Sequence, residues 1–416
     1  MFCTFSQLLF YHLLFFLLQH LLQYIFHYRM LELIYIPPLL CLLYFLLRRF
    51  VLENFYVESS GKYVLITGCD SGFGRRLAIQ LLDKRVNVFA ACFTQQGISS
   101  LQNEWNLKKG AKGQLYTIQL DVTNQASVDA AKQFVVKVLD EQKAKLWGLV
   151  NNAGIFSIHG PDDWCSVDEY STSLNVNTLG AVRMCHAFVP LVKKSRGRVV
   201  TMGSTAGRLH GLYVAPYVTA KFAVEAYMDC LRLEMRQYGV SVHILEPGCF
   251  KTELLNQDAQ RMRIQRIWNN LSAETKEEYG EDYRRNFETA WESGVNVVAN
   301  PNIGWVVDCY SHALFSWWPR LRYCPGWDAI FMFIPLSVFP TALQDWILAG
   351  LYRLSPGPSL TPAVLVKNKK RRTPVQWIQF LSQLAIIPLL YTIFFVKNTQ
   401  KQTVETAHPH NVTVTE

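Results

Sequence analysis

The stretch that decides the fold reads GKYVLITGCDSGFG and occupies residues 61–74. Its apolar run at 63–67 has the length of a buried strand, and a helix from Arg75 can follow the turn. Glycines in such a turn permit a tight bend, close approach of a pyrophosphate, and a helix start whose amides face the phosphates. Gly-rich turns are common, so the strand before this one and the helix after it strengthen the assignment.

The same alternation of strand and helix continues downstream of this turn. Helical-length segments separate further short apolar runs, which lie at 86–92, 115–120, 146–150, 198–202 and 240–245. Strand, helix and strand in repetition predict an α/β fold with a doubly wound parallel sheet. Ligands on such sheets bind beyond the carboxyl ends of the strands, so chemistry is expected directly after each run.

Short segments that contain polar residues or glycines follow the third to sixth of these strands. They are Asp121 and Val122 after the third, Asn151, Asn152, Ala153 and Gly154 after the fourth, Gly203 and Ser204 after the fifth, and Pro247, Gly248, Cys249, Phe250, Lys251 and Thr252 after the sixth. Asp121 is placed to accept a hydrogen bond from an adenine amino group, or to cap a helix. The Pro-Gly turn could line the nicotinamide side of a dinucleotide.

Tyr217 and Lys221 form a Tyr-x-x-x-Lys pair. On a helix, this spacing puts phenol and ammonium on one face. A phenol titrates near pH ~10, and a neighbouring cation favours its phenolate, which makes the tyrosine a candidate proton-transfer group. The pair alone is weak evidence. However, Ser204 precedes Tyr217 by thirteen residues, enough for one loop to return beside the strand end.

Composition argues against nucleic-acid binding and structural zinc. The net charge of +9 is concentrated in short runs beside apolar stretches, which is typical of membrane-flanking charge, and no basic stripe is interleaved with aromatic residues. The ten cysteines are scattered without a Cys-x-x-Cys pair or a Cys/His cluster. Buried cysteines in the middle of the chain mildly favour a reducing compartment.

Apolar segments at both ends predict membrane attachment. Residues 2–27 and 31–47 are apolar, although the second run contains Pro37 and Pro38, and we expect at least one membrane-inserted helix here. A cleaved signal peptide is the alternative, but no small-x-small site stands out. Residues 375–396 form a second candidate transmembrane helix. Arg48-Arg49 and the basic run at 367–372 both predict a catalytic domain on the cytoplasmic side.

Two glycosylation sequons test this topology against each other. Asn411 is usable only if the tail is lumenal, whereas Asn270 should stay unmodified if the domain is cytoplasmic. The apolar stretch at 330–348 is broken by Pro335 and Pro340, which favours an interfacial or pocket-covering segment over a span.

These patterns divide the chain into an anchor region, one α/β domain and C-terminal segments. The expected divisions are an N-terminal membrane anchor region at 1–55, a catalytic domain at 60–300, a C-terminal extension with an apolar substrate-side or interfacial segment at 301–366, a transmembrane helix at 375–396 and a polar tail at 397–416.

The ordered motifs resemble the short-chain dehydrogenase/reductase superfamily. The resemblance covers residues 60–255 and rests on the glycine turn, Asn-Asn-Ala-Gly, Asn177, Ser204, the Tyr217/Lys221 pair and the Pro-Gly turn. The stretches 61–74, 146–154 and 322–329 look like the membrane-bound retinol dehydrogenase and hydroxysteroid dehydrogenase branch, which extends the likeness to about residue 350.

The resemblance implies a Rossmann fold and a role for each motif residue. Tyr217 would exchange the proton with a substrate alcohol, Lys221 would lower its pKa and bind the nicotinamide ribose, and Ser204 would hold the substrate oxygen. Asn177 would hold a water that passes the proton through Lys221. The implied cofactor-binding residues are Thr67, Gly68, Asp70, Ser71, Gly72, Phe73, Gly74, Cys92, Asp121, Val122, Asn151, Ala153, Gly154, Tyr217, Lys221, Pro247, Gly248 and Thr252.

The sequence also bears on the cofactor and on the substrate. No cation stands at the end of the second strand, where Cys92 lies, or before the middle glycine, which favours NAD over NADP. Arg75 and Arg76 remain candidates for a 2′-phosphate. His210 and Tyr213, beside Ser204, are candidate substrate contacts or loop-packing residues.

The resulting hypothesis is a membrane-anchored oxidoreductase of a lipophilic alcohol such as a retinoid or hydroxysteroid. It would lie in the endoplasmic reticulum membrane, facing the cytoplasm, and analogy with the superfamily implies a homodimer. An NADPH-dependent carbonyl reductase is the alternative. A non-enzymatic scaffold is disfavoured, because Ser204, Tyr217, Lys221 and the glycines are all present.

Overall fold

The computed structural model describes residues 16–23, 31–108, 110, 113–157, 160–354 and 360–367. The candidate transmembrane helix at 375–396, the tail at 397–416, most of the basic run before them and the Asn411 sequon lie outside the described residues, so these expectations stay predictions.

In the described part of the chain, a parallel sheet of seven strands forms the centre of the fold, in the order β3-β2-β1-β4-β5-β6-β7. The strands are β1 (Tyr63–Thr67), β2 (Asn87–Cys92), β3 (Leu115–Gln119), β4 (Leu146–Asn151), β5 (Arg198–Met202), β6 (Ser241–Leu245) and β7 (Arg322–Tyr323). The predicted doubly wound parallel sheet is therefore confirmed.

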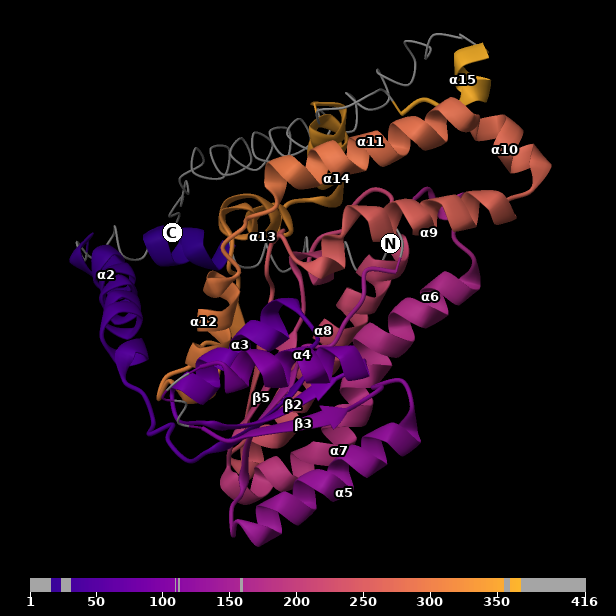
Figure 1. The fold of residues 1–416 in the computed structure, drawn as a ribbon. Coiled ribbons are helices and arrows are strands. Elements are labelled where there is room, and N and C mark those ends of the chain that lie inside the picture. Colours follow the sequence, from indigo (N-terminus) through magenta and orange to yellow (C-terminus); the bar gives the residue numbers. More distant parts are fainter. Residues whose placement is uncertain are drawn as a thin grey trace, which may run out of the picture. The chain divides into compact units, whose positions relative to one another are not determined.

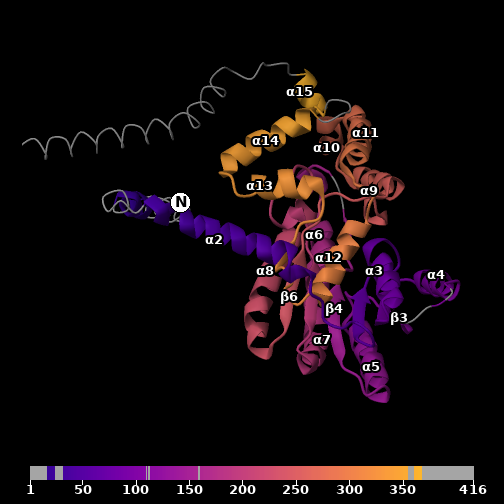
Figure 2. The same cartoon turned by 90° about the vertical axis from the view of Figure 1, so that its left-hand side faces the viewer.

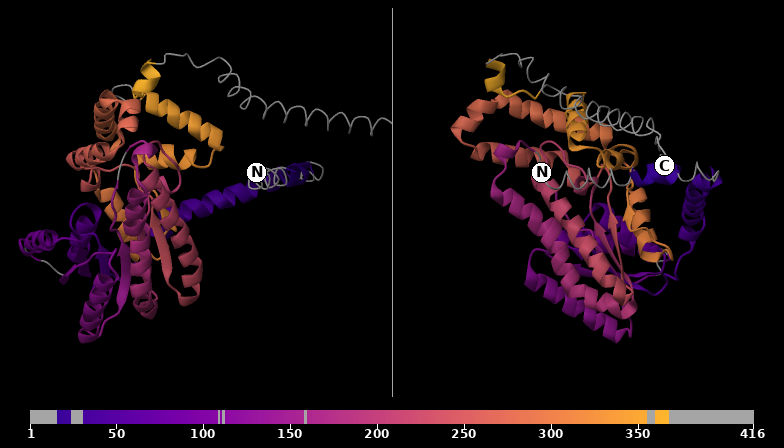
Figure 3. Two further views of the ribbon diagram at one scale, coloured as in Figure 1. Left: turned by 90° about the vertical axis from the view of Figure 1, so that its right-hand side faces the viewer. Right: turned by 180° about the vertical axis from the view of Figure 1, so that it is seen from behind.

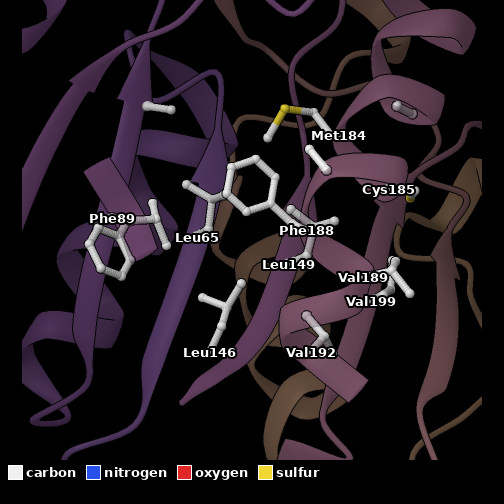
Figure 4. Packing of buried hydrophobic residues seen from close by; sticks show 14 of the residues in the cluster. Leu65, Phe89, Leu146, Leu149, Met184, Cys185, Phe188, Val189, Val192 and Val199 are labelled. Atoms are coloured by element: carbon white, nitrogen blue, oxygen red, sulfur yellow. The ribbon is translucent and has the colours of Figure 1, made fainter. Parts of the chain in front are cut away.

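Helices cover both faces of this sheet, which explains why its strands read as nearly continuous apolar runs (Figure 1). One core cluster joins the sheet to α5 (Gln125–Glu141), α7 (Gly180–Ser195) and α8 (Ala215–Met235). Its centre includes Leu65, Leu149 and Phe188 (Figure 4). The other joins it to α3 (Gly72–Asp83), α4 (Gln95–Asn106) and α12 (Gly304–Phe315).

The strand order places the topological switch between β1 and β4. β1 pairs with β2 on one side, Thr67 opposite Ala91, and with β4 on the other, Ile66 opposite Val150. The chain leaves these two strands in opposite directions along the sheet, so their carboxyl ends border the crevice where such folds bind ligands.

Two local differences separate this fold from the sequence expectation. Helix α3 begins at Gly72, three residues before Arg75, because Ser71 is extended and Gly72 can adopt a φ of 58° as the chain enters the helix. Strand β7 was not predicted. It has two residues and pairs parallel with β6, Ile244 opposite Arg322, which is too short to produce a periodic pattern.

Further helices lie over the carboxyl ends of the strands. α6 (Val167–Leu174) follows β4, and α9 (Gln257–Asn270) and α11 (Glu281–Val298) follow β6 (Figure 3). Residues 284–359 belong to the same compact unit as the sheet. A second unit contains 273–283 and the residues from 360; its described part includes α10 (Ala273–Tyr279) and α15 (Ala363–Lys367).

The apolar stretch at 330–348 is broken, as its prolines predict. It consists of the π-helical turn η7 (Ala329–Phe333), the short α13 (Ile334–Leu336) and α14 (Thr341–Leu354). Pro340 precedes the first residue of α14, where the missing amide hydrogen is harmless.

The N-terminal apolar segments are helical where they are described. Residues 16–23 form a helix, and α2 (Leu31–Phe50) continues through Pro37 and Pro38 and projects from the sheet (Figure 2). None of the helices in the described residues combines the length and apolar character that a bilayer crossing requires.

Candidate active site

Helix α8 carries Tyr217 and Lys221 on one face, one turn apart. The helix begins at Ala215 with Pro216 in its first turn, where a proline costs no hydrogen bond. Lys221 is buried, its Nζ lies 5.6 Å from the centre of the Tyr217 ring, and it donates a hydrogen bond of 2.9 Å to the carbonyl oxygen of Met202. The end of β5 therefore fixes the ammonium beside the phenol.

Ser204 comes to the same place from the end of β5. Its Oγ accepts a hydrogen bond of 3.1 Å from the amide of Ala206, and it caps the short 3-10 helix η4 (Thr205–Gly207). Ser204 lies close enough to Tyr217 for its hydroxyl to influence the pKa of the phenol. The structure thus brings Ser204, Tyr217 and Lys221 together, as the spacing of the sequence suggested.

Burial is the strongest influence on the titration of this pair. It raises the pKa of Tyr217 to about 12, and the hydrogen bond from Ser204 opposes that rise. Burial also lowers the pKa of Lys221 to about 8, while the Glu225 carboxylate one turn later opposes the decrease. At neutral pH the amine is therefore mostly protonated. Its positive charge is available to favour the phenolate.

Asn177 lies in a π-helical turn, η3 (Asn175–Leu179), that interrupts the helix between α6 and α7. Its Oδ1 accepts from the amide of Ile155 at 3.0 Å, and its Nδ2 donates to the carbonyl of Ile155 at 3.0 Å. A Cβ on Gly154 would lie 2.8 Å from Asn177 Oδ1 and 4.0 Å from Lys221 Nζ. Only a glycine leaves space between these two side chains.

The glycine turn after β1 fits a dinucleotide. A Cβ on Gly68 would lie 2.9 Å from Ala153 Cα, and one on Gly74 would lie 2.4 Å from the carbonyl oxygen of Gly68, so both glycines allow the turn to close. Gly72 has a positive φ and lies opposite Thr252, whose Cβ would be 3.7 Å from an added Cβ. The phosphate-binding turn and the loop after β6 therefore face each other.

The end of β4 is braced against this turn. Thr67 Oγ1 accepts hydrogen bonds from the amides of Asn152 and Ala153, each at 3.0 Å. Asn152 Nδ2 donates to the carbonyl oxygens of Thr67 at 2.9 Å and Gly68 at 3.1 Å, and Tyr310 donates to its Oδ1 at 3.2 Å. Asn152, which stands between Asn151 and Ala153 of the motif, therefore holds the end of β4 against the turn.

Asn151 points into the sheet instead. It is buried and donates to Thr201 Oγ1 at 3.1 Å and to Cys185 Sγ at 3.4 Å. The alternation of side chains along a strand turns consecutive residues to opposite faces, which explains the different partners of Asn151 and Asn152.

Asp70 supplies a carboxylate at the end of β2, although none follows that strand in the sequence. Its Oδ2 accepts from the amide of Phe93 at 2.8 Å, and its Oδ1 accepts from the amide and hydroxyl of Thr94 at 2.9 and 2.8 Å. A Cβ on Gly97 would lie 2.5 Å from Asp70 Oδ1. In dinucleotide-binding folds, an acidic residue near this position binds the ribose hydroxyls.

The other predicted cofactor residues surround the same crevice. Asp121 Oδ1 accepts from the amide of Thr123 at 2.8 Å, which is a contact within the turn. The helix-capping alternative for Asp121 is not what the structure has, because Asn124 is the N-cap of α5. Val122 and Cys92 are buried, and burial raises the pKa of the Cys92 thiol to about 12. Phe73 packs edge-on against Phe250 with ring centres 5.8 Å apart.

The substrate side contains aromatic residues that sequence reasoning missed. Phe156 is buried, with its ring 4.8 Å from the ring of Tyr217 and stacked 5.4 Å from the ring of Trp291 on α11. Arg263 and Gln260 of α9 donate to the carbonyl oxygen of Phe156, the latter at 3.4 Å. Phe156 follows the Asn-Asn-Ala-Gly motif by two residues, but only the fold reveals its contact with Tyr217.

His210 and Tyr213 contact helices that close this side. His210 is exposed and its Nε2 lies 2.8 Å from Asp345 Oδ1 on α14. Tyr213 has a φ of 65° and packs edge-on against Phe287 and Tyr352, with ring centres 5.2 and 5.1 Å apart. Both residues thus make the loop-packing contacts that were the alternative to a substrate role.

Comparisons with known proteins point to one family. Residues 62–263 match the family model described as short chain dehydrogenase. The chain is 87% identical over 388 residues to a Caenorhabditis elegans protein named 3beta-hydroxysteroid dehydrogenase dhs-16, covering 93% of this chain and all of that protein. It is 40% identical to the 17-beta-hydroxysteroid dehydrogenase type 6 of Bos taurus, covering 74% of this chain and 93% of that one.

A further relative carries a retinol dehydrogenase name, and a solved structure shares the fold. Retinol dehydrogenase 7 of Rattus norvegicus is 41% identical, over 73% of this chain and 92% of its own length. A crystal structure of a short chain dehydrogenase/reductase from Burkholderia phymatum has a TM-score of 0.54 at 21% identity, covering 70% of this chain and 96% of that one.

Proposed function

Because the chain belongs to the short-chain dehydrogenase family, and is thus an NAD(P)-dependent oxidoreductase, we propose that it interconverts a 3β-hydroxysteroid and the corresponding ketone. The observation that carries the substrate choice is the 87% identity to a protein named for this activity, over all of that protein's length. The grouping of Ser204, Tyr217 and Lys221 supplies the chemistry that the reaction needs.

The chemistry of the bound nicotinamide is to accept or return the hydride. Ser204 holds the substrate oxygen within reach of the phenol, which is a positioning and electrostatic role. During oxidation, the deprotonated oxygen of Tyr217 takes the hydroxyl proton, and during reduction the phenol gives it back. The role proposed for Lys221 is to favour the phenolate by its positive charge. Its Nζ lies 5.6 Å from the centre of the Tyr217 ring and is held by the carbonyl oxygen of Met202 at 2.9 Å.

Asn177 completes this set as the residue that holds a proton-relaying water near Lys221. Its support is that the Asn177 and Lys221 side chains both lie beside Gly154. A Cβ on that glycine would be 2.8 Å from Asn177 Oδ1 and 4.0 Å from Lys221 Nζ. Its amide also fixes Ile155 and thereby the start of the segment that carries Phe156.

NAD is the preferred cofactor in this proposal. The Asp70 carboxylate lies at the end of β2, where it suits ribose hydroxyls and repels a 2′-phosphate. Arg75, the candidate phosphate-binding cation, pairs instead with Glu104 at 2.7 Å and donates to the carbonyl of Ser100 at 2.9 Å. This arrangement supports oxidation with NAD over reduction with NADPH.

The substrate side suits a flat lipophilic ring system. Phe156 and Trp291 stack beside Tyr217. Aromatic faces bury large apolar areas at little conformational cost, and sterols offer such area. Retinol remains the competing substrate, because several relatives carry retinol dehydrogenase names.

Membrane association, in the endoplasmic reticulum with the catalytic domain facing the cytoplasm, is part of the proposal. Its support on α2 is a set of exposed apolar side chains, namely Leu39, Leu40, Leu42, Leu43, Tyr44, Phe45, Leu46 and Leu47. Arg48 and Arg49 end this helix, and Glu53 binds both of them as well as Arg320. Basic residues next to an apolar helix favour the cytoplasmic face.

Turnover by membranes that contain the full chain tests the function. A 3β-hydroxysterol with NAD should be oxidised, and Tyr217→Phe should keep NADH binding but lose about 10²- to 10⁴-fold in kcat. All-trans-retinol and a 17β-hydroxysteroid serve as competing substrates, and 3-ketosteroid with NADPH tests the reductase alternative. Faster oxidation of retinol, or normal activity of Tyr217→Phe, would contradict the proposal.

A further inference from the structure

A C-terminal segment lies directly against the turn that follows β6. The amide of Glu246 donates to the carbonyl of Tyr323 at 2.6 Å, and the amide of Gly248 donates to the carbonyl of Pro325 at 3.0 Å. The amide of Cys249 donates to the carboxylate of Asp328 at 2.7 Å. Three amides of the turn are therefore held by residues about eighty positions later in the chain.

The fit around the Asp328 carboxylate leaves no room for a side chain. A Cβ on Gly248 would lie 2.1 and 2.2 Å from its two oxygens, and a Cβ on Gly326 would lie 2.5 Å from one of them. Gly326 also has a φ of 115°, which other residues rarely adopt. Two glycines thus make space for one carboxylate against the backbone.

The opposite side of the same turn faces the active site. The carbonyl of Pro247 accepts a hydrogen bond of 3.2 Å from the amide of Thr205, the residue after Ser204. Cys249 is close enough to Tyr217 to affect the pKa of its phenol, and Thr252 lies against Gly72 of the phosphate-binding turn. The turn therefore connects Asp328 to both the catalytic pair and the cofactor crevice.

We propose that Asp328 is a positioning residue that fixes the Pro247–Cys249 turn against the nicotinamide end of the cofactor. The inference rests on the proposed function. It goes beyond it, because Asp328 lies outside residues 62–263, which the family model matches. The C-terminal segment is thus a working part of the cofactor site.

The expected effect is confined to one half of the dinucleotide. Without the carboxylate, the Cys249 amide loses its partner and the turn is free to shift, while Gly68 and Asp70 make their own contacts to Ala153 and to the end of β2. An unmade buried hydrogen bond changes an equilibrium by about tenfold. NADH should therefore bind about tenfold more weakly to Asp328→Ala, whereas ADP-ribose, which lacks the nicotinamide, should bind as it does to the wild type.

The test measures dissociation constants of NADH and ADP-ribose, with kcat and KM, for the full-length wild type, Asp328→Ala and Asp328→Asn. Asparagine keeps an acceptor oxygen for the Cys249 amide, so it should restore NADH affinity. Asp345→Ala is the matched control, because Asp345 is an exposed carboxylate that pairs with His210 on the substrate side. It should leave both ligands unaffected.

Measurable binding of NADH and ADP-ribose that is weakened equally in Asp328→Ala, or unchanged affinity for NADH, would overturn the proposal. If the alanine variant binds neither ligand, Asp328→Glu decides, since it keeps the charge but cannot keep the 2.7 Å bond without displacing the turn. If Asp328→Glu binds NADH more weakly than the wild type but binds ADP-ribose equally well, the proposal is supported. If Asp328→Glu binds NADH with wild-type affinity, the proposal is refuted. Absence of NADH binding by the wild type would instead refute the proposed function.

Discussion

Arg322 on β7 holds two buried carboxylates beneath the catalytic helix, and its removal should be costly. It pairs with Glu225 of α8 and with Glu246 after β6, and its Nη2 lies 2.6 Å from Asp229 Oδ2. Glu225 is one turn beyond Lys221, and a Cβ on Gly203 would lie 2.0 Å from its Oε1. We consider Arg322→Met, which keeps most of the side-chain volume and removes the charge.

The magnitude follows from the burial of the partners. Glu225 and Glu246 are 4% and 1% exposed, so losing Arg322 leaves the buried Glu246 carboxylate with Arg208 alone and the buried Glu225 carboxyl, whose pKa is raised, without its cation. Breaking such a pair costs about 3–5 kcal/mol. We expect the lower end, about 3 kcal/mol, because Glu246 retains Arg208 at 3.1 Å. Total stabilities are only about 5–15 kcal/mol, so the loss is large.

The loss should grow with pH. Burial and the nearby Glu246 raise the pKa of Glu225 to about 8, and Arg322 opposes this rise. Stability from a raised carboxyl pKa is fully present below the unfolded value of 4.5 and lost as pH rises through the folded value. Without Arg322 the folded pKa rises further, so the deficit relative to the wild type increases by up to about 1.4 kcal/mol per pH unit above pH 8.

Urea unfolding followed by tryptophan fluorescence, on the full chain in mild detergent at pH 6 and pH 9, measures this difference. Arg261→Met is the matched control, because its partners Asp258 and Glu292 are at the surface and its loss should cost at most about 1 kcal/mol. Adding Glu225→Gln to Arg322→Met should recover part of the stability. The same deficit at both pH values, or no recovery by Glu225→Gln, would refute the reasoning.

Two further predictions concern ligands. Asp70→Ala should lower the preference for NAD over NADP by at least about tenfold, because a carboxylate close to a 2′-phosphate repels it by several kcal/mol at the dielectric of a protein surface. The ratio of kcat/KM with NAD to kcat/KM with NADP measures this preference, and an unchanged ratio would contradict the prediction. Phe156→Leu should raise KM for the sterol by about tenfold and leave KM for NAD unchanged, because the aromatic contacts with Tyr217 and Trp291 are lost. An equal rise in KM for the sterol and for NAD would contradict this prediction and indicate a structural role for Phe156.

Much of the sheet was predictable because its strands are buried on both faces. The runs at 63–67 and 198–202 match β1 and β5 residue for residue, and the other four predicted strands differ by one residue at an end. Apolar runs of this length, separated by helical segments, leave few other arrangements. The same rule placed Ser204 and the Pro-Gly turn at strand ends.

Contacts between distant segments were not predictable from local patterns. Neither the two-residue strand β7 nor the pairing of Phe156 with Tyr217 leaves a periodic signal, because each depends on where the chain returns in space. The motif also did not show whether Asn151 or Asn152 contacts the glycine turn. Which of two adjacent residues faces the glycine turn depends on the register of β4 against β1.

Asp70 shows most clearly why a rule based on strand ends was incomplete. The end of β2 carries Cys92, Phe93 and Thr94 and no acidic residue, so the sequence favours NAD only through the absence of a cation there. In the structure, the side chain of Asp70 extends from the turn after β1 to the end of β2. There its carboxylate accepts hydrogen bonds from the amides of Phe93 and Thr94. β1 and β2 are neighbours with Thr67 opposite Ala91, so a side chain from one strand end can occupy the position expected of the other. A function assigned to a position in space can therefore be supplied by whichever adjacent strand end reaches it.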